Sequence, residues 1–272
     1  MKEPFYCYFI RSGWPERVEA PAAIGAKFVK TLDALSGIDS IFAAWVLFDK
    51  LFDTRSVTAV SLANARSRIS EIVENNVTRN DFGEVSLVRG YHANARAGEF
   101  RDPRSVNFSV TAGGRYENGT KLAFGEYDVA PDLGIVTYPL FKAALVAINA
   151  IWQAPWACAQ AFRSGAVSVP TTEFGGVPGF RIDSVPQVPS EPAFPYSIFH
   201  IPWIAYLSPD LGAGLKVTSE ILTEHLPDGG FLTSVTTERF DPADPEHLRR
   251  ARILAGVMIE RTGYQRGKPM YA

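Results

Sequence analysis

The chain has 272 residues and a formal net charge of −2, with 46% hydrophobic and 21% charged residues. A chain of this length buries roughly three quarters of its unfolded surface on folding, so it needs no disulfide framework or metal to stay folded. The near-neutral charge argues against a general nucleic-acid binder or a polybasic membrane-surface protein, because both need an excess of Lys and Arg.

No targeting or membrane segment is evident. The N-terminal residues lack the basic start and apolar stretch of a signal peptide, and no apolar run reaches the ~18 residues of a membrane span. We therefore expect a cytoplasmic protein without a membrane partner. The two cysteines, Cys7 and Cys158, lie in apolar runs and are expected to be free buried thiols, with a disulfide between them as the alternative.

Strand and helix patterns alternate along the N-terminal part. The aromatic run Phe5–Ile10 predicts a strand, and Glu16–Leu35 predicts a helix with one apolar face. The continuously apolar run Ile41–Phe48 predicts a buried central strand with Trp45 in its middle. Apolar residues at helical spacing then predict a second helix over Leu62–Val73.

The middle of the chain has the pattern of an antiparallel meander followed by a helix. Strands are predicted at Val85–Val88, Val106–Thr111 and Lys121–Tyr127. Asn118-Gly119 predicts a hairpin turn, because both residues tolerate positive φ. Tyr138–Trp152 is the clearest helix of this part, and Trp156–Phe162 is expected to continue it as a kinked turn after Pro155.

A stretch rich in proline and glycine, residues 170–194, predicts a linker or long surface loop, because proline fixes φ and removes a backbone donor. It separates an N-terminal α+β region, residues 1–169, from a C-terminal α+β region, residues 195–272. We expect the second region to pack on the first in one compact unit.

The C-terminal region predicts a strand–turn–strand–helix unit. Tyr196–Leu207 and Phe231–Thr236 are its predicted strands, Lys216–Leu222 is a weaker strand candidate, and Asp228-Gly229-Gly230 is a turn. Asp244-Pro245-Glu246 opens the last helix, with Asp244 as the N-cap. The expected fold class is α+β, with antiparallel or mixed sheets flanked by about four helices.

Motifs of enzyme chemistry are missing from the sequence. The four histidines form no pair at metal-ligand spacing. Neither a phosphate-binding loop nor a nucleophile elbow is found. We therefore expect no catalytic residue, no metal and no cofactor, with a metal site assembled from distant residues as the alternative. The histidines are His92, His200, His225 and His247.

The charge pattern of the C-terminal region is more informative. Between Val217 and Leu248 there are seven acids against one base, Arg239. Local acidity on a near-neutral protein suits a basic partner such as a nuclease, because complementary potential speeds encounter. Glu246 faces the dipole of the last helix. The other six acids are the expected partner-binding residues: Glu220, Glu224, Asp228, Glu238, Asp241 and Asp244.

Some of these acids have other interpretations. Glu238, Asp241, Asp244 and Glu246 crowd one short segment and could include a general acid and base. Helix capping and the end of a strand explain Asp244 and Asp241 equally well, and we favour that interpretation over catalysis.

Four segments, in their order and spacing, resemble the immunity protein 52 family. They are Trp203–Ser208 (WIAYLS), Asp228–Leu232 (DGGFL), Glu238–Asp241 (ERFD) and Asp244–His247 (DPEH). Asp244 stands where the family often has Asn. The residues that carry the resemblance, including an earlier tryptophan, are Trp45, Trp203, Tyr206, Gly229, Gly230, Phe240 and His247.

The resemblance implies an α+β immunity protein of a bacterial polymorphic toxin system, such as one delivered by type VI secretion. Such a protein binds and blocks a cognate nuclease toxin of the restriction-endonuclease type, and it does so without catalysis. Two mechanisms are open, namely occupation of the toxin's basic cleft by the acidic segment or binding at a distant surface. The alternatives are a small hydrolase or transferase that uses an acidic residue and a histidine, and an adaptor of a secretion machine.

Overall fold

The computed structural model describes residues 5–51, 57–77, 90–114, 118–125, 129–164, 170–171, 179–180 and 201–262. The strands of the main sheet are β1 (Phe5–Trp14), β2 (Trp45–Asp49), β3 (Thr58–Ser61), β4 (Tyr91–Ala97), β5 (Val106–Ala112), β6 (Asn118–Phe124), β7 (Trp156–Ser164), β10 (Ile201–Leu207), β11 (Leu222–His225) and β12 (Phe231–Ser234). A separate pair is formed by β8 (Pro170–Thr171) and β9 (Gly179–Phe180).

Helical segments connect these strands. They are α1 (Pro21–Ser36), α2 (Leu62–Ala65), α3 (Ile69–Asn75), α4 (Tyr138–Trp152), α5 (Pro209–Gly212) and α6 (Pro245–Thr262), with 3₁₀ turns η1 (Ser40–Phe42) and η2 (Arg66–Arg68). None of the helices in the described ranges is long and apolar enough to span a bilayer.

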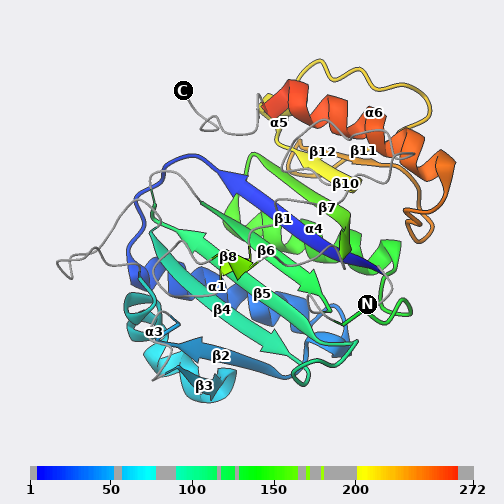
Figure 1. The fold of residues 1–272 in the computed structure, drawn as a ribbon. Helices are drawn as coiled ribbons and strands as arrows, with labels where there is room; N and C mark the ends of the chain where they lie inside the picture. The colour runs from blue at the N-terminus through cyan, green and yellow to red at the C-terminus, as the bar shows by residue number, and fades with distance from the viewer. Residues whose placement is uncertain are drawn as a thin grey trace.

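A single ten-stranded sheet organises the molecule (Figure 1), and the predicted α+β class is confirmed. Its order is β11-β12-β10-β7-β1-β6-β5-β4-β2-β3, and each pair of neighbours runs antiparallel. The sheet therefore continues from the strands of residues 1–169 into those of residues 195–272. Most of the predicted linker, residues 170–194, lies outside the described residues, and the division into regions stays a prediction.

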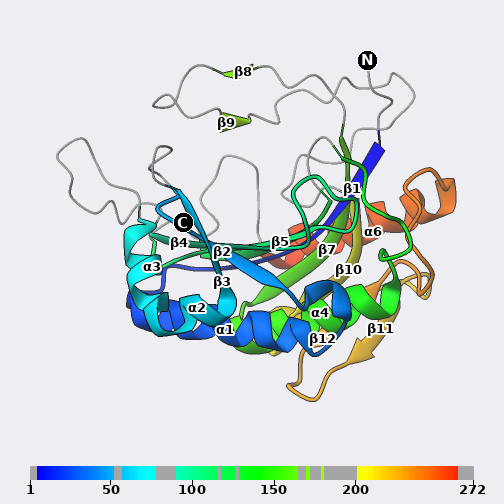
Figure 2. The ribbon, with the colours of Figure 1, turned by 90° about the horizontal axis from the view of Figure 1, so that it is seen from below.

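Helices α1 and α4 cover one face of the sheet (Figure 2), and the strands turn alternate side chains toward them. On β1 these include Tyr8, which lies edge-on to Phe141 of α4 at 6.3 Å between ring centroids, and Trp14, which stacks on Trp152 at 5.3 Å. Helix α6 packs against β10 at the other end of the sheet from α3 (Figure 1). The core thus runs under the whole sheet.

The prediction of one central strand over Ile41–Phe48 is wrong. Asp39 accepts a hydrogen bond from the backbone N–H of Ile41 at 2.9 Å, and this cap starts the turn η1 instead. Only the second half of the run is extended. It forms β2, which lies next to the edge strand β3, with Trp45 buried.

The helical prediction for Trp156–Phe162 is also wrong, because this segment is the central strand β7. Its alanines Ala157, Ala159 and Ala161 are buried and pair with Ser12, Ile10 and Tyr8 of β1. Cys158 lies on this strand and Cys7 lies on β1. Both are free buried thiols, as predicted. Burial raises the pKa of the Cys158 thiol above its ordinary value.

The hairpin predicted around Asn118-Gly119 exists, but the turn lies earlier in the chain. Both residues belong to β6, which pairs with β5. The Asn118 side chain accepts a hydrogen bond from the N–H of Gly114 at 3.0 Å and donates one to its carbonyl at 2.7 Å. Asn118 therefore stabilises the start of β6 through its side-chain amide, and it does not occupy the turn as predicted.

The helix predictions differ in accuracy. The bounds of α4 agree with those predicted, whereas α1 begins at Pro21 and not at Glu16, since proline is suited to the first helical position. The segment Leu62–Val73 is divided between α2, η2 and α3. Strand β4 was not predicted, and the strand predicted at Val85–Val88 lies outside the described residues.

The C-terminal strand–turn–strand–helix unit is confirmed with one shift. The first strand of its hairpin is β11, which begins where the weaker candidate Lys216–Leu222 ends. Strand β12 and helix α6 follow in the predicted places.

Candidate partner-binding surface

Trp203 on β10 anchors the C-terminal unit to the rest of the fold. Its side chain is completely buried, and its ring lies 5.1 Å from that of Phe141 on α4 and 6.3 Å from that of Phe240. The indole N–H donates a hydrogen bond to the carbonyl of Thr236 at 3.1 Å. One side chain therefore joins helix α4, strand β10 and the loop that leads to α6.

The turn between β11 and β12 is built from the predicted glycine pair. The N–H of Gly229 donates to the carbonyl of Leu226 at 2.9 Å, with Pro227 at the second position of the turn. Gly229 has φ +82°, in the left-handed region that glycine adopts without a steric penalty. This is a type I turn followed by a left-handed residue, a common three-residue hairpin connection.

Tyr206 and Gly230 fit each other closely beneath this turn. The Tyr206 hydroxyl donates to Asp228 Oδ2 at 3.0 Å, and Asp228 Oδ1 accepts from the N–H of Gly230 at 2.8 Å. A Cβ atom on Gly230 would lie 2.5 Å from the Tyr206 ring. Burial, and then the bond to Asp228, raises the pKa of Tyr206 to about 12.

Phe240 and His247 pin the loop between β12 and α6. Phe240 is fully buried, and its carbonyl accepts a hydrogen bond from the Tyr8 hydroxyl of β1 at 3.1 Å. The imidazole of His247 stacks on Phe240 with 5.5 Å between ring centroids. His247 Nδ1 accepts a hydrogen bond from the N–H of Asp241 at 3.1 Å, which holds the start of α6 against the loop.

Besides Asp228, two of the predicted acids have backbone partners. Asp244 Oδ1 accepts from the N–H groups of Glu246 at 2.7 Å and His247 at 3.3 Å, so Asp244 is the N-cap of α6 as predicted. Asp241 Oδ1 accepts from the N–H of Ala243 at 2.8 Å. The donors in these contacts are neutral backbone amides and not basic side chains.

Three further acids are held by basic side chains. Arg249 contacts both Glu220 and Glu246, with 2.8 Å from its Nε to the Glu246 carboxylate. Arg250 Nε lies 2.8 Å from the same carboxylate of Glu246. Glu224 pairs with Lys142 of α4. All of these groups are partly solvent-exposed, and exposed pairs of this kind contribute little to stability.

The predicted acids therefore separate into two groups. Asp228 lies in the hairpin turn, bonded to Tyr206, and Glu224 lies on β11. The remaining acids gather at the opposite end of the hairpin, which we call the acidic end. It consists of Glu220, Glu238, Asp241, Asp244 and Glu246, with Arg239, Arg249 and Arg250 among them. Glu238 is exposed, and its carboxylate has no partner among the described residues.

The pKa of Glu246 gives the acidic end a testable pH dependence. Hydrogen bonds from Arg249 and then Arg250 lower this pKa from 4.5 to about 2. A lowered pKa in the folded state stabilises the fold above about pH 4.5, and this contribution is lost as the pH falls toward 2. We expect the free energy of unfolding of the wild type to fall more steeply over this range than that of Glu246→Gln, measured by urea titration.

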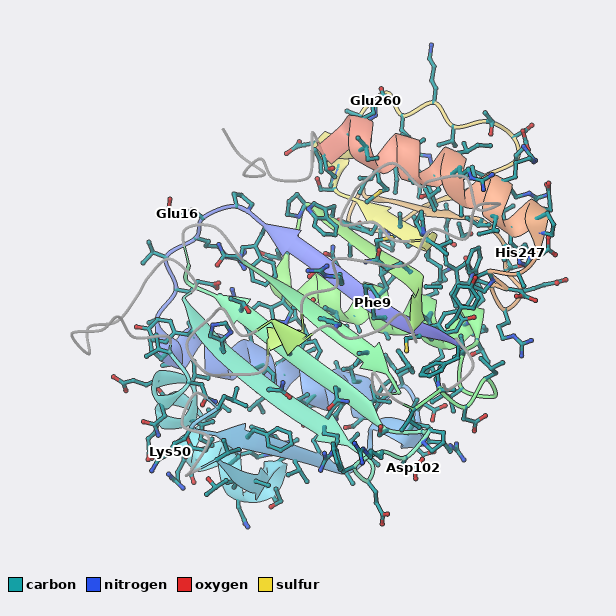
Figure 3. All side chains as sticks on the ribbon, viewed as in Figure 1. Phe9, Glu16, Lys50, Asp102, His247 and Glu260 are labelled. Atoms are coloured by element: carbon teal, nitrogen blue, oxygen red, sulfur yellow. The ribbon has the colours of Figure 1, made fainter. Side chains whose placement is uncertain are left out.

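Glu260→Gln is the control for that titration. Glu260 and His247 lie at opposite ends of α6 (Figure 3), so the control removes a carboxylate from the same helix away from Arg249 and Arg250. Identical pH profiles for the two variants would contradict the assigned cause.

Part of this ion-pair network can be predicted from the spacing of the charged residues in the sequence. Arg249 and Arg250 follow Glu246 by three and four residues, the helical spacing at which opposite charges meet. The partners of Glu220 and Glu224 come from other elements, and no local spacing indicates them.

An acid and a histidine do come together, as the enzyme alternative requires. His247 lies beside Asp241, but its Nδ1 accepts from a backbone amide and its ring stacks on buried Phe240, which is typical of a structural role. Within the described ranges, no three His, Cys, Asp or Glu side chains are grouped to hold a metal ion. A hollow of about 360 Å³ lies near the start of α1. Its lining includes Glu16, Glu19, Pro21, Tyr91 and Gly113.

Comparison with known proteins gives similarity in fold and none in sequence. No family model and no curated protein sequence matches the chain. The fold is similar to the solved structure of the Pseudomonas aeruginosa T6SS protein PA0821, with a TM-score of 0.52 and 10% sequence identity. The similarity covers 95% of this chain and 76% of that chain, so it includes both the central sheet and the C-terminal unit.

Proposed function

We propose that this protein is an immunity protein that binds and neutralises a nuclease toxin delivered by a bacterial competition system of the type VI kind. The observation that carries the proposal is the construction of the C-terminal unit. Of the residues shared with the immunity protein 52 pattern, Trp203, Tyr206, Gly230 and Phe240 are buried in this unit, whereas Glu238 and Asp241 of the acidic end are exposed.

The structural relative supports the same proposal at a coarser level. A fold similar to that of a protein of the type VI secretion system is consistent with a role in toxin delivery or in protection from it. The family pattern then favours protection over delivery, because it resembles immunity proteins.

The contacts of the acids favour three of them for toxin binding. Glu220, Glu224 and Glu246 already form ion pairs with basic side chains. Asp241 and Asp244 contact backbone amides, and Glu238 is exposed, so these three acids form no such ion pair among the described residues. We propose that these three steer the protein toward the basic nucleic-acid cleft of the toxin, because complementary charge speeds association.

The resemblance implies that the cognate toxin is encoded beside this gene. Co-expression with that toxin tests the function, and a charge-removing variant tests the mechanism. Glu238→Gln, Asp241→Asn and Asp244→Asn together remove three charges, while each asparagine can still accept the backbone hydrogen bonds described above. We expect the wild type to restore growth and to form a one-to-one complex. The triple variant should associate at least about ten-fold more slowly at low salt.

The matched control removes three carboxylates elsewhere, with Glu16→Gln, Glu74→Gln and Glu99→Gln. Absence of growth rescue and of a complex with the wild type would refute the function. A triple variant that associates as fast as the control would refute only the electrostatic role of the acidic end.

The two alternatives predict different results. A secretion adaptor would bind components of the secretion machine without restoring growth in the presence of the toxin. A hydrolase or transferase would turn over a small substrate, and His247→Ala would abolish that turnover in folded protein.

A further inference from the structure

Strand β11 is an outer strand of the ten-stranded sheet, and its outer edge faces solvent. It pairs with β12 on one side, and on the other side no strand follows it among the described residues. All four of its residues are exposed, and the apolar side chain of Leu222 is 45% exposed. The backbone groups along this edge are therefore accessible to another extended chain.

The turn determines which backbone groups point outward. The N–H of Leu226 donates to the carbonyl of Gly230 at 2.8 Å, so these opposed residues form a hydrogen-bonded pair. Such pairs alternate along antiparallel strands. Glu224 consequently bonds to β12, whereas the N–H and C=O groups of Thr223 and His225 point away from it.

Several of the usual protections of an edge strand are missing from β11, although the strand itself is short, with four residues. Lysine, proline and bulges commonly prevent edges from pairing, and Leu222–His225 has none of them. Its one carboxylate, on Glu224, is drawn toward Lys142 on the α4 side of the sheet. The opposite edge strand, β3, runs directly into α2, which packs against it.

We propose that β11 accepts an extended segment of the toxin as an added antiparallel strand; this inference rests on the proposed function. Backbone hydrogen bonds at Thr223 and His225 would provide the pairing. Charge favours a basic segment over a second copy of this chain. The acids beside this edge are Glu220, Glu224 and Asp228. The first two are paired with Arg249 and Lys142 but stay partly exposed, and the contacts of Asp228 are with a hydroxyl and a backbone amide. In a symmetric dimer these acids would lie opposite acids of the second copy, and like charges opposed in this way are unfavourable.

The pair Thr223→Pro and Thr223→Val tests the proposal against the toxin domain encoded beside this gene. Proline removes the outward N–H of Thr223 without removing a bond to β12, whereas valine keeps the N–H and changes only the side chain. We expect Thr223→Pro to weaken the complex by about ten-fold or more in calorimetric titration, since one backbone hydrogen bond and the strand geometry are lost. Thr223→Val should bind like the wild type.

Hydrogen exchange on the wild type gives a second readout that does not depend on the folding of a variant. The amides of Thr223 and His225 should exchange quickly in the free protein and become protected in the complex. Equal affinities for the two variants, with both amides still exchanging freely, would overturn the proposal and leave the proposed function intact. If the wild type neither restores growth nor binds the toxin, the function fails, and this inference fails with it. A wild-type dimer that Thr223→Pro abolishes would identify a second copy as the occupant and also overturn it.

Discussion

Replacement of Trp203 by alanine is expected to lower the free energy of unfolding by about 3–5 kcal/mol, the range for removal of a large buried aromatic side chain. The change would leave a cavity between Phe141 and Phe240 and an unsatisfied carbonyl at Thr236. Urea unfolding with a constant slope would measure the loss.

Trp203→Phe is the graded control for this prediction. It keeps an aromatic ring in the same place and removes the indole hydrogen bond, so a smaller loss is expected. Surface substitutions usually change the free energy of unfolding by less than about 1 kcal/mol. A loss this small for Trp203→Ala would mean that Trp203 does not anchor the unit.

Gly230→Ala is expected to destabilise the protein by about 1–3 kcal/mol, the usual effect of adding a methyl group to a tightly packed site. The new Cβ would lie 2.5 Å from the Tyr206 ring. The ring has little freedom to move, because it is buried and its hydroxyl is bonded to Asp228. The same urea titration would measure the change.

A double-mutant cycle separates this clash from other effects of the substitution. In a Tyr206→Leu background the smaller side chain relieves the clash, so Gly230→Ala should destabilise much less. Equal effects in both backgrounds would show that the close contact with Tyr206 is not the cause. Gly229→Asn is the control at the neighbouring turn position, because asparagine tolerates positive φ.

Segments with a clear period were predicted best from the sequence. Helix α4 has apolar residues at regular helical intervals, and its bounds agree with the prediction. Strands β4 and β7 were not predicted, because both are rich in small residues. Ala93, Ala95 and Ala97 alternate inward on β4, but alanine is a good helix former and a poor strand former, so pattern and propensity disagree.

The candidate site shows the same division. The cap by Asp244 and the turn at Gly229-Gly230 depend on neighbouring residues, and both were predictable. The pairing of Glu224 with Lys142 joins residues 82 positions apart. Only the assembled sheet brings such groups together, and this pairing decides which acids remain available to a partner.

The central place of β1 has a consequence for synthesis of the chain. β1 emerges from the ribosome well before its neighbours β6 and β7, which begin only at Asn118 and Trp156. Translation proceeds at roughly 5–20 residues per second, so the apolar residues of β1 stay without a strand partner for about 5–20 seconds. During this time chaperones can bind the exposed apolar residues of β1, until β6 and β7 are made and pair with it on both sides.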